Sequence, residues 1–179
     1  MRKTVLVLAM VMAWIFAGAL PAGAAPGDDP SWSGDYSLMR FAASKTGTSA
    51  AASQREPDFS DVYTFATDCT DGNCVASVVA GPPPANESLQ NRPIDYTWDG
   101  TSWVHTYDWV WDCWKGAGSP KEYNDAHSVA YYTPQPDGSL TGVWTTTIYG
   151  GYCDGTVVMN VAAYPVSPLP ALPPMFGSS

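Results

Sequence analysis

Few side chains in this 179-residue sequence are suited to catalysis, and their spacing matches no known catalytic motif. The only two histidines are His105 and His127, and no nucleophile elbow, ordered Ser/His/Asp set or phosphate-binding loop accompanies them. Asp108 and Asp112 share one face of a predicted strand, as a glycosidase carboxylate pair would. Since that face is the polar one, we expect both aspartates to be solvent-exposed, and we predict a protein without catalytic activity.

The four cysteines are the next candidates for chemistry, and the first two flank an Asp-Gly turn. In a two-residue hairpin centred on Asp71 and Gly72, Cys69 and Cys74 form the second residue pair out from the turn, where Cβ atoms are close. This spacing predicts a disulfide. A zinc site would need a second cysteine or histidine pair, which the sequence lacks, so we expect no metal and no cofactor.

Strand order predicts the pairing of the other two cysteines. If the strands run up and down in sequence, Cys113 ends the fifth strand and Cys153 precedes the eighth, so both lie at one rim of the sheet. A Cys69–Cys113 bond would have to span the height of the sheet, at about 3.3 Å per residue, which exceeds the ~6 Å Cα separation of a disulfide. We therefore predict Cys113–Cys153.

The first 24 residues predict export. Arg2 and Lys3 precede an apolar run of 16 residues, 5–20, and Ala22-Gly23-Ala24 supplies a cleavage site for signal peptidase. The run is shorter than the roughly 20 residues that span a bilayer, and no cysteine follows it to carry a lipid. We expect a protein secreted to the extracellular or cell-envelope space without a membrane anchor.

Composition predicts one acidic domain beyond this signal peptide. We assign residues 25–31 to a flexible leader, 32–165 to a single β domain and 166–179 to a Pro-rich tail. Without the signal peptide, six Lys and Arg oppose 17 Asp and Glu, a net charge of −11. Nucleic acids and anionic membranes bind through clustered basic residues, so neither is an expected partner, and we expect a monomer.

The β domain contains eight β-type runs separated by turn residues and no convincing amphipathic helix. The pattern predicts an all-β fold: a small antiparallel up-and-down barrel or curved sheet of about eight strands with lipocalin-like closure and two disulfides. Residues 42–55 fit a loop, an extended continuation or a short helix, and 81–92 form a loop. The predicted strands are 36–41, 61–69, 74–80, 94–98, 101–113, 128–133, 140–149 and 156–164.

Two further Asp-Gly turns predict which side chains point inward. A two-residue turn at Asp99-Gly100 pairs Trp98 with Thr101. Because side chains alternate along a strand, one face then carries the aromatic set Ile94, Tyr96, Trp98, Trp103, His105, Tyr107, Trp109 and Trp111. A similar turn at Asp137-Gly138 places Val129 and Tyr131 beside Leu140, Trp144, Thr146 and Ile148.

This aromatic face is the candidate binding surface. It fills the core, as large aromatic residues commonly do, lines a ligand pocket, or stacks against sugars. We expect His105 to be a neutral, packed histidine held without metal, and His127 to have a solvated or capping role. The candidate binding residues are Trp103, His105, Tyr107, Trp109, Trp111 and Trp144.

The order of these motifs resembles that of a known protein family. Tyr96–Gly100 with Trp103, Trp109–Cys113, Pro136–Leu140 and Cys153–Val157, together with the four cysteines, are similar to an uncharacterised family of small secreted proteins from mycobacteria and related actinobacteria. The resemblance runs from about Trp32 to Pro165. It implies the compartment and the fold, and it transfers no catalytic residue.

Three functions fit the sequence. The first is a non-catalytic binding module for an apolar or lipid-like ligand, because an eight-stranded barrel is wide enough to hold one small ligand. The second is a cell-envelope interaction protein that binds a glycan or protein partner through its outer surface. The third, a secreted hydrolase, would need a cleft with two facing carboxylates.

Overall fold

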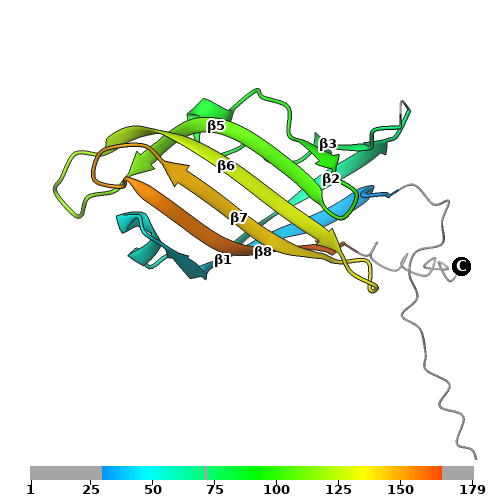
Figure 1. Ribbon diagram of the computed structural model, residues 1–179, viewed down its shortest axis with the longest axis horizontal. Helices are drawn as coiled ribbons and strands as arrows, with labels where there is room; N and C mark the ends of the chain where they lie inside the picture. The colour runs from blue at the N-terminus through cyan, green and yellow to red at the C-terminus, as the bar shows by residue number, and fades with distance from the viewer. Residues whose placement is uncertain (1–29, 71, 167–179) are drawn as a thin grey trace, which may run out of the picture.

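The computed structural model is a closed barrel of eight antiparallel strands that follow one another in sequence order, with β1 paired to β8 (Figure 1). It describes residues 30–70 and 72–166. The strands are β1 Gly34–Gly47, β2 Phe59–Asp68, β3 Val75–Ala80, β4 Asp95–Trp98, β5 Trp103–Cys113, β6 Glu122–Pro134, β7 Leu140–Ile148 and β8 Gly155–Pro165. The predicted up-and-down barrel is confirmed. The predicted signal peptide, most of the leader and nearly all of the tail lie outside the described residues.

Residues 42–55 contain both an extended continuation and a short helix. β1 runs on to Gly47 past an irregularity in its pairing with β8, and the 3-10 helix η1 (Ala50–Ser53) follows. Ser49 caps this helix by accepting a hydrogen bond from the Ala51 N–H, and its own hydroxyl donates to the Cys153 carbonyl at 2.6 Å. Position 47 has room only for glycine, because a Cβ there would lie 2.0 Å from the backbone carbonyl oxygen of Thr156.

The β4–β5 hairpin keeps the predicted inward face although its register differs. The structure pairs Trp98 with Trp103, so the predicted Trp98–Thr101 pair is wrong. The turn starts one residue later, because Asp99 closes it with Ser102, and Gly100 supplies the positive φ at the first central position. The register moves by two residues, and a shift of two leaves every side chain on its original face.

The β6–β7 hairpin contradicts the prediction, because its register differs by one residue and the face of β6 is reversed. Ala130 pairs with Trp144, so the even-numbered residues of β6 point inward, and Tyr131 is exposed. Pro136 explains the error: a two-residue turn would need its N–H for the closing hydrogen bond, which proline lacks. The turn closes instead between Gln135 and Ser139.

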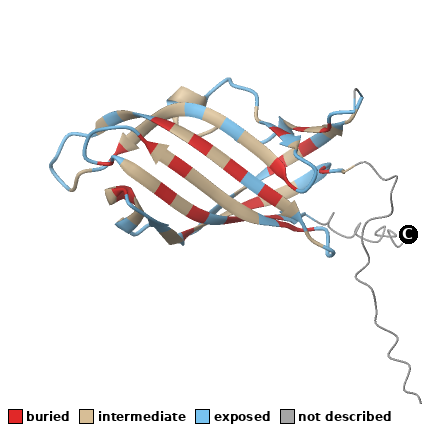
Figure 2. Ribbon diagram, viewed as in Figure 1, coloured by how far each residue is buried: buried red, intermediate tan, exposed pale blue. Residues whose placement is uncertain are grey.

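The barrel interior holds two apolar clusters, visible as alternating buried positions along the strands (Figure 2). The larger, here the Trp32 cluster, comprises Trp32, Leu38, Tyr63, Phe65, Cys74, Ala76, Tyr96, Trp103, Ala130, Tyr132, Leu140, Val161 and Ala163. The smaller, the disulfide cluster, comprises Ala51, Cys113, Ala126, Ile148, Cys153 and Val157, with Trp109 and Trp111 packed against it.

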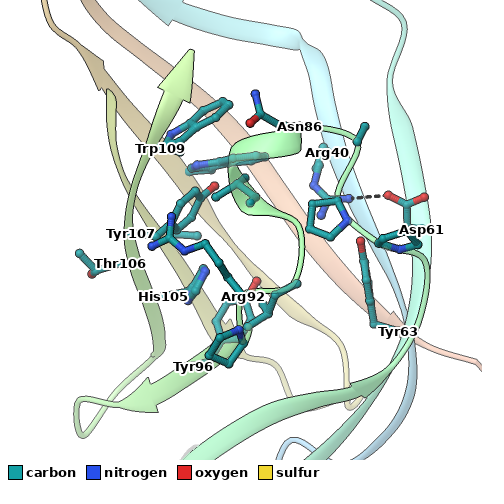
Figure 3. Close-up of a pocket in the computed structure, with 18 of the residues that line it drawn as sticks. Arg40, Asp61, Tyr63, Asn86, Arg92, Tyr96, His105, Thr106, Tyr107 and Trp109 are labelled. Carbon is teal, nitrogen blue, oxygen red and sulfur yellow. Dashed lines mark hydrogen bonds and ion pairs between the residues drawn. The ribbon is translucent and has the colours of Figure 1, made fainter. Parts of the chain in front are cut away.

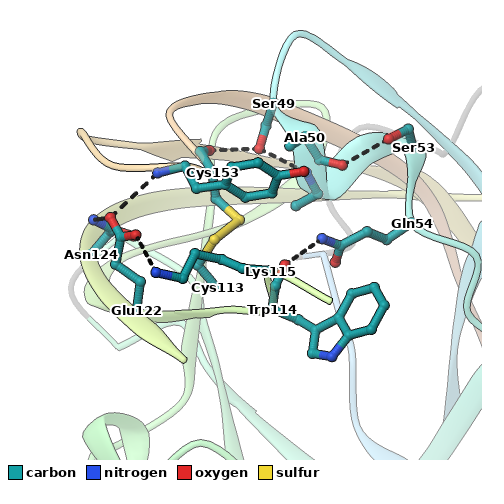
Figure 4. The surroundings of a disulfide bond; sticks show 12 residues. Ser49, Ala50, Ser53, Gln54, Cys113, Trp114, Lys115, Glu122, Asn124 and Cys153 are labelled. Carbon is teal, nitrogen blue, oxygen red and sulfur yellow. Dashed lines mark hydrogen bonds and ion pairs between the residues drawn. A yellow bond between two sulfur atoms is a disulfide. The ribbon is translucent and has the colours of Figure 1, made fainter. Parts of the chain in front are cut away.

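Both predicted disulfides are present. Cys69–Cys74 joins the ends of β2 and β3 with a Cα separation of 4.0 Å, and Cys113–Cys153 joins β5 to the segment before β8 at 5.9 Å. Around the second bond, Gln54 donates to the Trp114 carbonyl at 2.8 Å (Figure 4). These contacts hold η1 and the β5 end together at one rim of the barrel.

Candidate functional site

A cavity of about 580 Å³ lies inside the barrel. On one side it shares lining residues with the Trp32 cluster, and on the other it borders Trp109, which packs against the disulfide cluster. Its volume is within the range of small-molecule sites, roughly 300–1,000 Å³. The rings that line it include Tyr96, Tyr107 and Trp109, which are labelled in Figure 3. Tyr132 and Trp144 also belong to the lining. The middle of the barrel therefore has room for a ligand.

The wall beside this cavity is not completed by strands. β3 ends opposite Thr64, so the first half of β2 has no β3 partner. β4 pairs with β5 only at Val104 and Trp103, so most of β5 has no β4 partner. Residues 81–93, here called the strap, cross this gap and include the 3-10 helix η2 (Glu87–Leu89). Sequence reasoning identified a loop here but not its position over the cavity.

Side chains, not a continuous backbone ladder, attach the strap to β5. The Asn86 amide donates to the Val110 carbonyl at 2.9 Å, and the Val110 N–H donates to the Ser88 hydroxyl at 3.1 Å. Arg92 donates to the Asp108 carbonyl at 2.6 Å. Three such bonds cover the free edge of β5 and leave the strap easier to detach than a paired strand.

Four of the six predicted binding residues line the cavity. They are His105, Tyr107, Trp109 and Trp144. The rings of His105 and Tyr107 stack with centroids 4.6 Å apart, and Tyr107 lies 6.4 Å from Trp144. The predicted aromatic face thus forms one continuous wall of the cavity in its central part.

The other two predicted residues lie apart from the cavity. Trp103 is fully buried in the Trp32 cluster, 5.3 Å from the Trp98 ring and 6.4 Å from Trp32. Trp111 packs with the disulfide cluster, 5.2 Å from Trp109. These tryptophans close the two ends of the site instead of lining it.

His105 is held by packing and by one hydrogen bond. Its Nδ1 lies 2.7 Å from the Asp95 carbonyl oxygen and therefore acts as the donor. Burial lowers the pKa of His105 below its ordinary value, and this outweighs the opposing effect of the Asp95 carbonyl. His127 instead points outward from β6 and contacts the Asp108 carboxylate at 2.7 Å.

Arg40 is the main cavity residue that the sequence reasoning missed. It alternates with Leu38 and Ala42 on β1, which are both buried, so the period of two already places its side chain inside the barrel. Its guanidinium donates to Asp61 at 3.3 Å and lies 5.8 Å from the Trp144 ring centre. Figure 3 shows Arg40 on the wall facing Trp109.

A small polar network positions the Trp109 ring. Its indole N–H donates to the Ser128 hydroxyl at 2.9 Å, and one hydrogen bond joins the hydroxyls of Ser128 and Thr146, whose oxygens are 2.8 Å apart. Ser128 and Thr146 are both buried and face inward from β6 and β7. The network therefore fixes one edge of the cavity wall.

The described residues, 30–70 and 72–166, contain no group of three or more His, Cys, Asp or Glu side chains arranged to hold a metal ion. No helix in that part of the chain is long and apolar enough to cross a membrane. The two aspartates that were expected to be solvent-exposed do not line the cavity: Asp108 is largely exposed, and Asp112 is partly exposed and forms an ion pair with Lys121. Among described residues, the cavity lining contains one carboxylate, Asp61.

Comparison with known proteins identifies the family. The family model of the PknI serine/threonine-protein kinase sensor domain matches residues 29–171. The chain belongs to this family. The resemblance to an uncharacterised family is corrected accordingly: the mycobacterial connection holds, and the family is a defined one of PknI sensor domains.

A solved PknI sensor domain shares the fold. The monomer form of the Mycobacterium tuberculosis PknI sensor domain is 18% identical, with a TM-score of 0.57, covering 82% of this chain and 96% of that one. The dimer form is 20% identical, with a TM-score of 0.48, covering 70% and 87%. No curated protein matches the chain.

Proposed function

We propose that this PknI-family domain is a non-catalytic sensing module that binds an apolar, lipid-like ligand in its barrel cavity, outside the cytoplasm. The cavity of about 580 Å³ beneath the strap is the observation that carries the proposal. The two disulfides and the signal peptide predicted from the sequence support an extracellular or cell-envelope location. The domain is proposed to act as a monomer.

The lining favours an apolar chain over a polar metabolite. Tyr107, Trp109 and Trp144 present ring surfaces, and Ile94 and Leu89 add aliphatic groups from the strap side. Burial of an alkyl chain against such surfaces yields about 0.8 kcal/mol per methylene group. A ligand of moderate length therefore gains enough to offset the entropy lost on association.

The strap supplies a route into the cavity. It is attached by side-chain hydrogen bonds at Asn86, Ser88 and Arg92, each of which contributes about 0.5–1.5 kcal/mol to stability. Detaching these bonds leaves the strand pairs of the barrel intact. Ligand entry through this gap requires no unfolding of the sheet.

Tryptophan fluorescence tests the proposal. The protein is titrated with a fluorescent alkyl probe, and quenching or energy transfer from tryptophan reports binding. Trp109→Ala removes one cavity wall and is expected to abolish uptake, whereas Trp114→Ala removes an exposed indole outside the cavity and is expected to leave uptake unchanged.

Native mass spectrometry of protein purified from its own host provides an independent readout. A co-purifying lipid that is absent from Trp109→Ala would support the cavity as its site. No bound lipid and no probe uptake by the wild type would contradict the proposed function.

A second candidate function is binding of a glycan or protein by the outer surface. Exposed aromatic residues lie near the Cys113–Cys153 rim. Trp114 directly follows Cys113 and Tyr152 directly precedes Cys153, while Tyr123 lies on β6 and Tyr149 directly follows β7. Exposed aromatic patches mark interaction sites. Loss of polysaccharide or protein binding in Trp114→Ala, with normal probe uptake, would favour this function.

A further inference from the structure

We propose that the ligand of this cavity is an amphipath with an anionic head group, a carboxylate or a phosphate, and that Arg40 binds that group. This inference rests on the proposed function and specifies the ligand class. It places the head group beside β1 and β2 and the alkyl chain along the aromatic wall of β5 and β7.

Arg40 is a charged group on the wall of a largely apolar cavity. Its side chain is 15% exposed, against 42% for Asp61, its only ion-pair partner among the described residues. Removing a guanidinium from water is costly unless its donors are satisfied. A site that keeps such a group beside a cavity is suited to an incoming anion.

The pairing with Asp61 uses little of the guanidinium. Arg40 has five N–H donors, and one of its nitrogens, Nη1, contacts one Asp61 oxygen at 3.3 Å. Among the described residues, the Tyr63 hydroxyl is a second polar neighbour, and its hydrogen bond with Arg40 opposes the rise that burial causes in the pKa of this phenol. Asp61 and Tyr63 together still leave several of the five N–H donors for a ligand. A carboxylate or phosphate can accept from these remaining donors in the bidentate geometry that arginine favours.

Charge in the cavity is opposite to that of the whole chain. The sequence has a net charge of −9 and only four arginines, of which Arg40 and Arg92 line the cavity. Among the residues that the structure describes, Asp61 is the single acidic residue in the lining. Positive charge is therefore concentrated at the site in a protein that otherwise repels anions.

Buried phenols provide neutral donors near Arg40. Burial raises the pKa of Tyr132 to about 12, and Arg40 is the strongest influence that opposes this rise. Tyr132 therefore stays protonated at neutral pH, close enough to Arg40 to sense its charge. Tyr96 also lines the cavity, and burial raises its pKa as well.

The test compares ligands that share one alkyl chain and differ in head group. Dodecanoate, dodecyl phosphate, dodecanol and dodecylamine compete with the alkyl probe for wild-type protein. The wild type is expected to bind the two anions roughly 10- to 100-fold more tightly than the alcohol, as a charged hydrogen bond would give, and the amine most weakly. Preference between carboxylate and phosphate identifies the source of the anion.

Three variants assign that preference to Arg40. Arg40→Gln is expected to remove the difference between acid and alcohol while the alcohol still binds. Asp61→Asn removes the competing carboxylate and is expected to tighten binding of the anions. Arg55→Gln changes an exposed arginine outside the cavity and is expected to have no effect.

The outcomes separate this inference from the proposed function. Equal affinity of wild type for acid, alcohol and amine would overturn the inference and leave the apolar-ligand function standing. Weaker anion binding in Asp61→Asn would also overturn it, because the ion pair would then be structural. Failure of every dodecyl ligand to bind would overturn both. If Arg40→Gln does not fold, the wild-type head-group series and Asp61→Asn still decide.

Discussion

Trp103 and Trp109 lie on the same face of β5, six residues apart, yet one is sealed in a core and the other borders a cavity. Around Trp103 the wall is complete, since β4 pairs with β5 there, and Trp32 fills the interior by stacking on Phe65 at 4.2 Å. Around Trp109 the neighbouring strand is missing and the strap replaces it. A hollow barrel here is thus a consequence of where β3 and β4 stop.

Replacing the two tryptophans should separate these regions most strongly. Trp103→Ala removes a fully buried ring and is expected to cost about 3–5 kcal/mol of unfolding free energy. Trp109→Ala is expected to cost less than about 3 kcal/mol, because part of its surface already faces empty space. Urea denaturation of both variants measures the difference, and equal costs would contradict a hollow region at Trp109.

The two disulfides should contribute differently to the free energy of unfolding, because they close loops of different length. In the chain-entropy model, Cys113–Cys153, with a sequence separation of 40, contributes about 4 kcal/mol, and Cys69–Cys74, with a separation of 5, about 2 kcal/mol. Paired Cys→Ser variants and thermal unfolding test this. A larger loss from the Cys69–Cys74 variant would show that strain or local packing governs instead.

A substitution in the strap should change its amide hydrogen-exchange rates more than it changes the free energy of unfolding. Asn86→Ala removes the bond to the Val110 carbonyl and the cap that accepts from Ser88, at a cost of about 1 kcal/mol. We expect faster amide exchange at residues 81–93 and faster probe entry and release. Asp137→Ala, which removes comparable bonds to Ser139 in a remote turn, is the matched control. Equal exchange rates in both variants would contradict a detachable strap.

The sequence predicts the barrel well because strands and cysteine spacings are signalled by residues close together in the chain. Which side chains point into the barrel is predicted less well, because this depends on the exact position of each turn. At Asp99-Gly100 the register shifts by two residues, so every side chain stays on its predicted face. At Pro136 the register shifts by one residue, so the inward and outward faces of β6 are interchanged. Tyr132 lines the cavity, although alternation with Tyr131, which was predicted to point inward, would place it on the outer face.

Arg40 and the strap show two different limits of sequence reasoning. The inward position of Arg40 follows from its alternation with Leu38, but a charged residue in a predicted strand is ordinarily assigned to the solvent-facing side. The strap's position depends on β3 and β4 ending early, which is set by pairing distant in sequence. No local pattern in residues 81–93 therefore predicts that they lie over the cavity.

The smallest expected effect concerns His105 and pH. Its pKa is lowered by burial, with Arg92 contributing in the same direction and the Asp95 carbonyl and carboxylate opposing. The unfolded chain therefore binds more protons than the folded one as pH falls below about 6.5, so this contribution to stability is present at neutral pH and lost on acidification. His105→Asn should flatten the decline in unfolding free energy between pH 7.5 and about pH 5, measured by urea denaturation. An identical decline in variant and wild type would place the acid sensitivity elsewhere, in the carboxylates of the turns and not in the cavity wall.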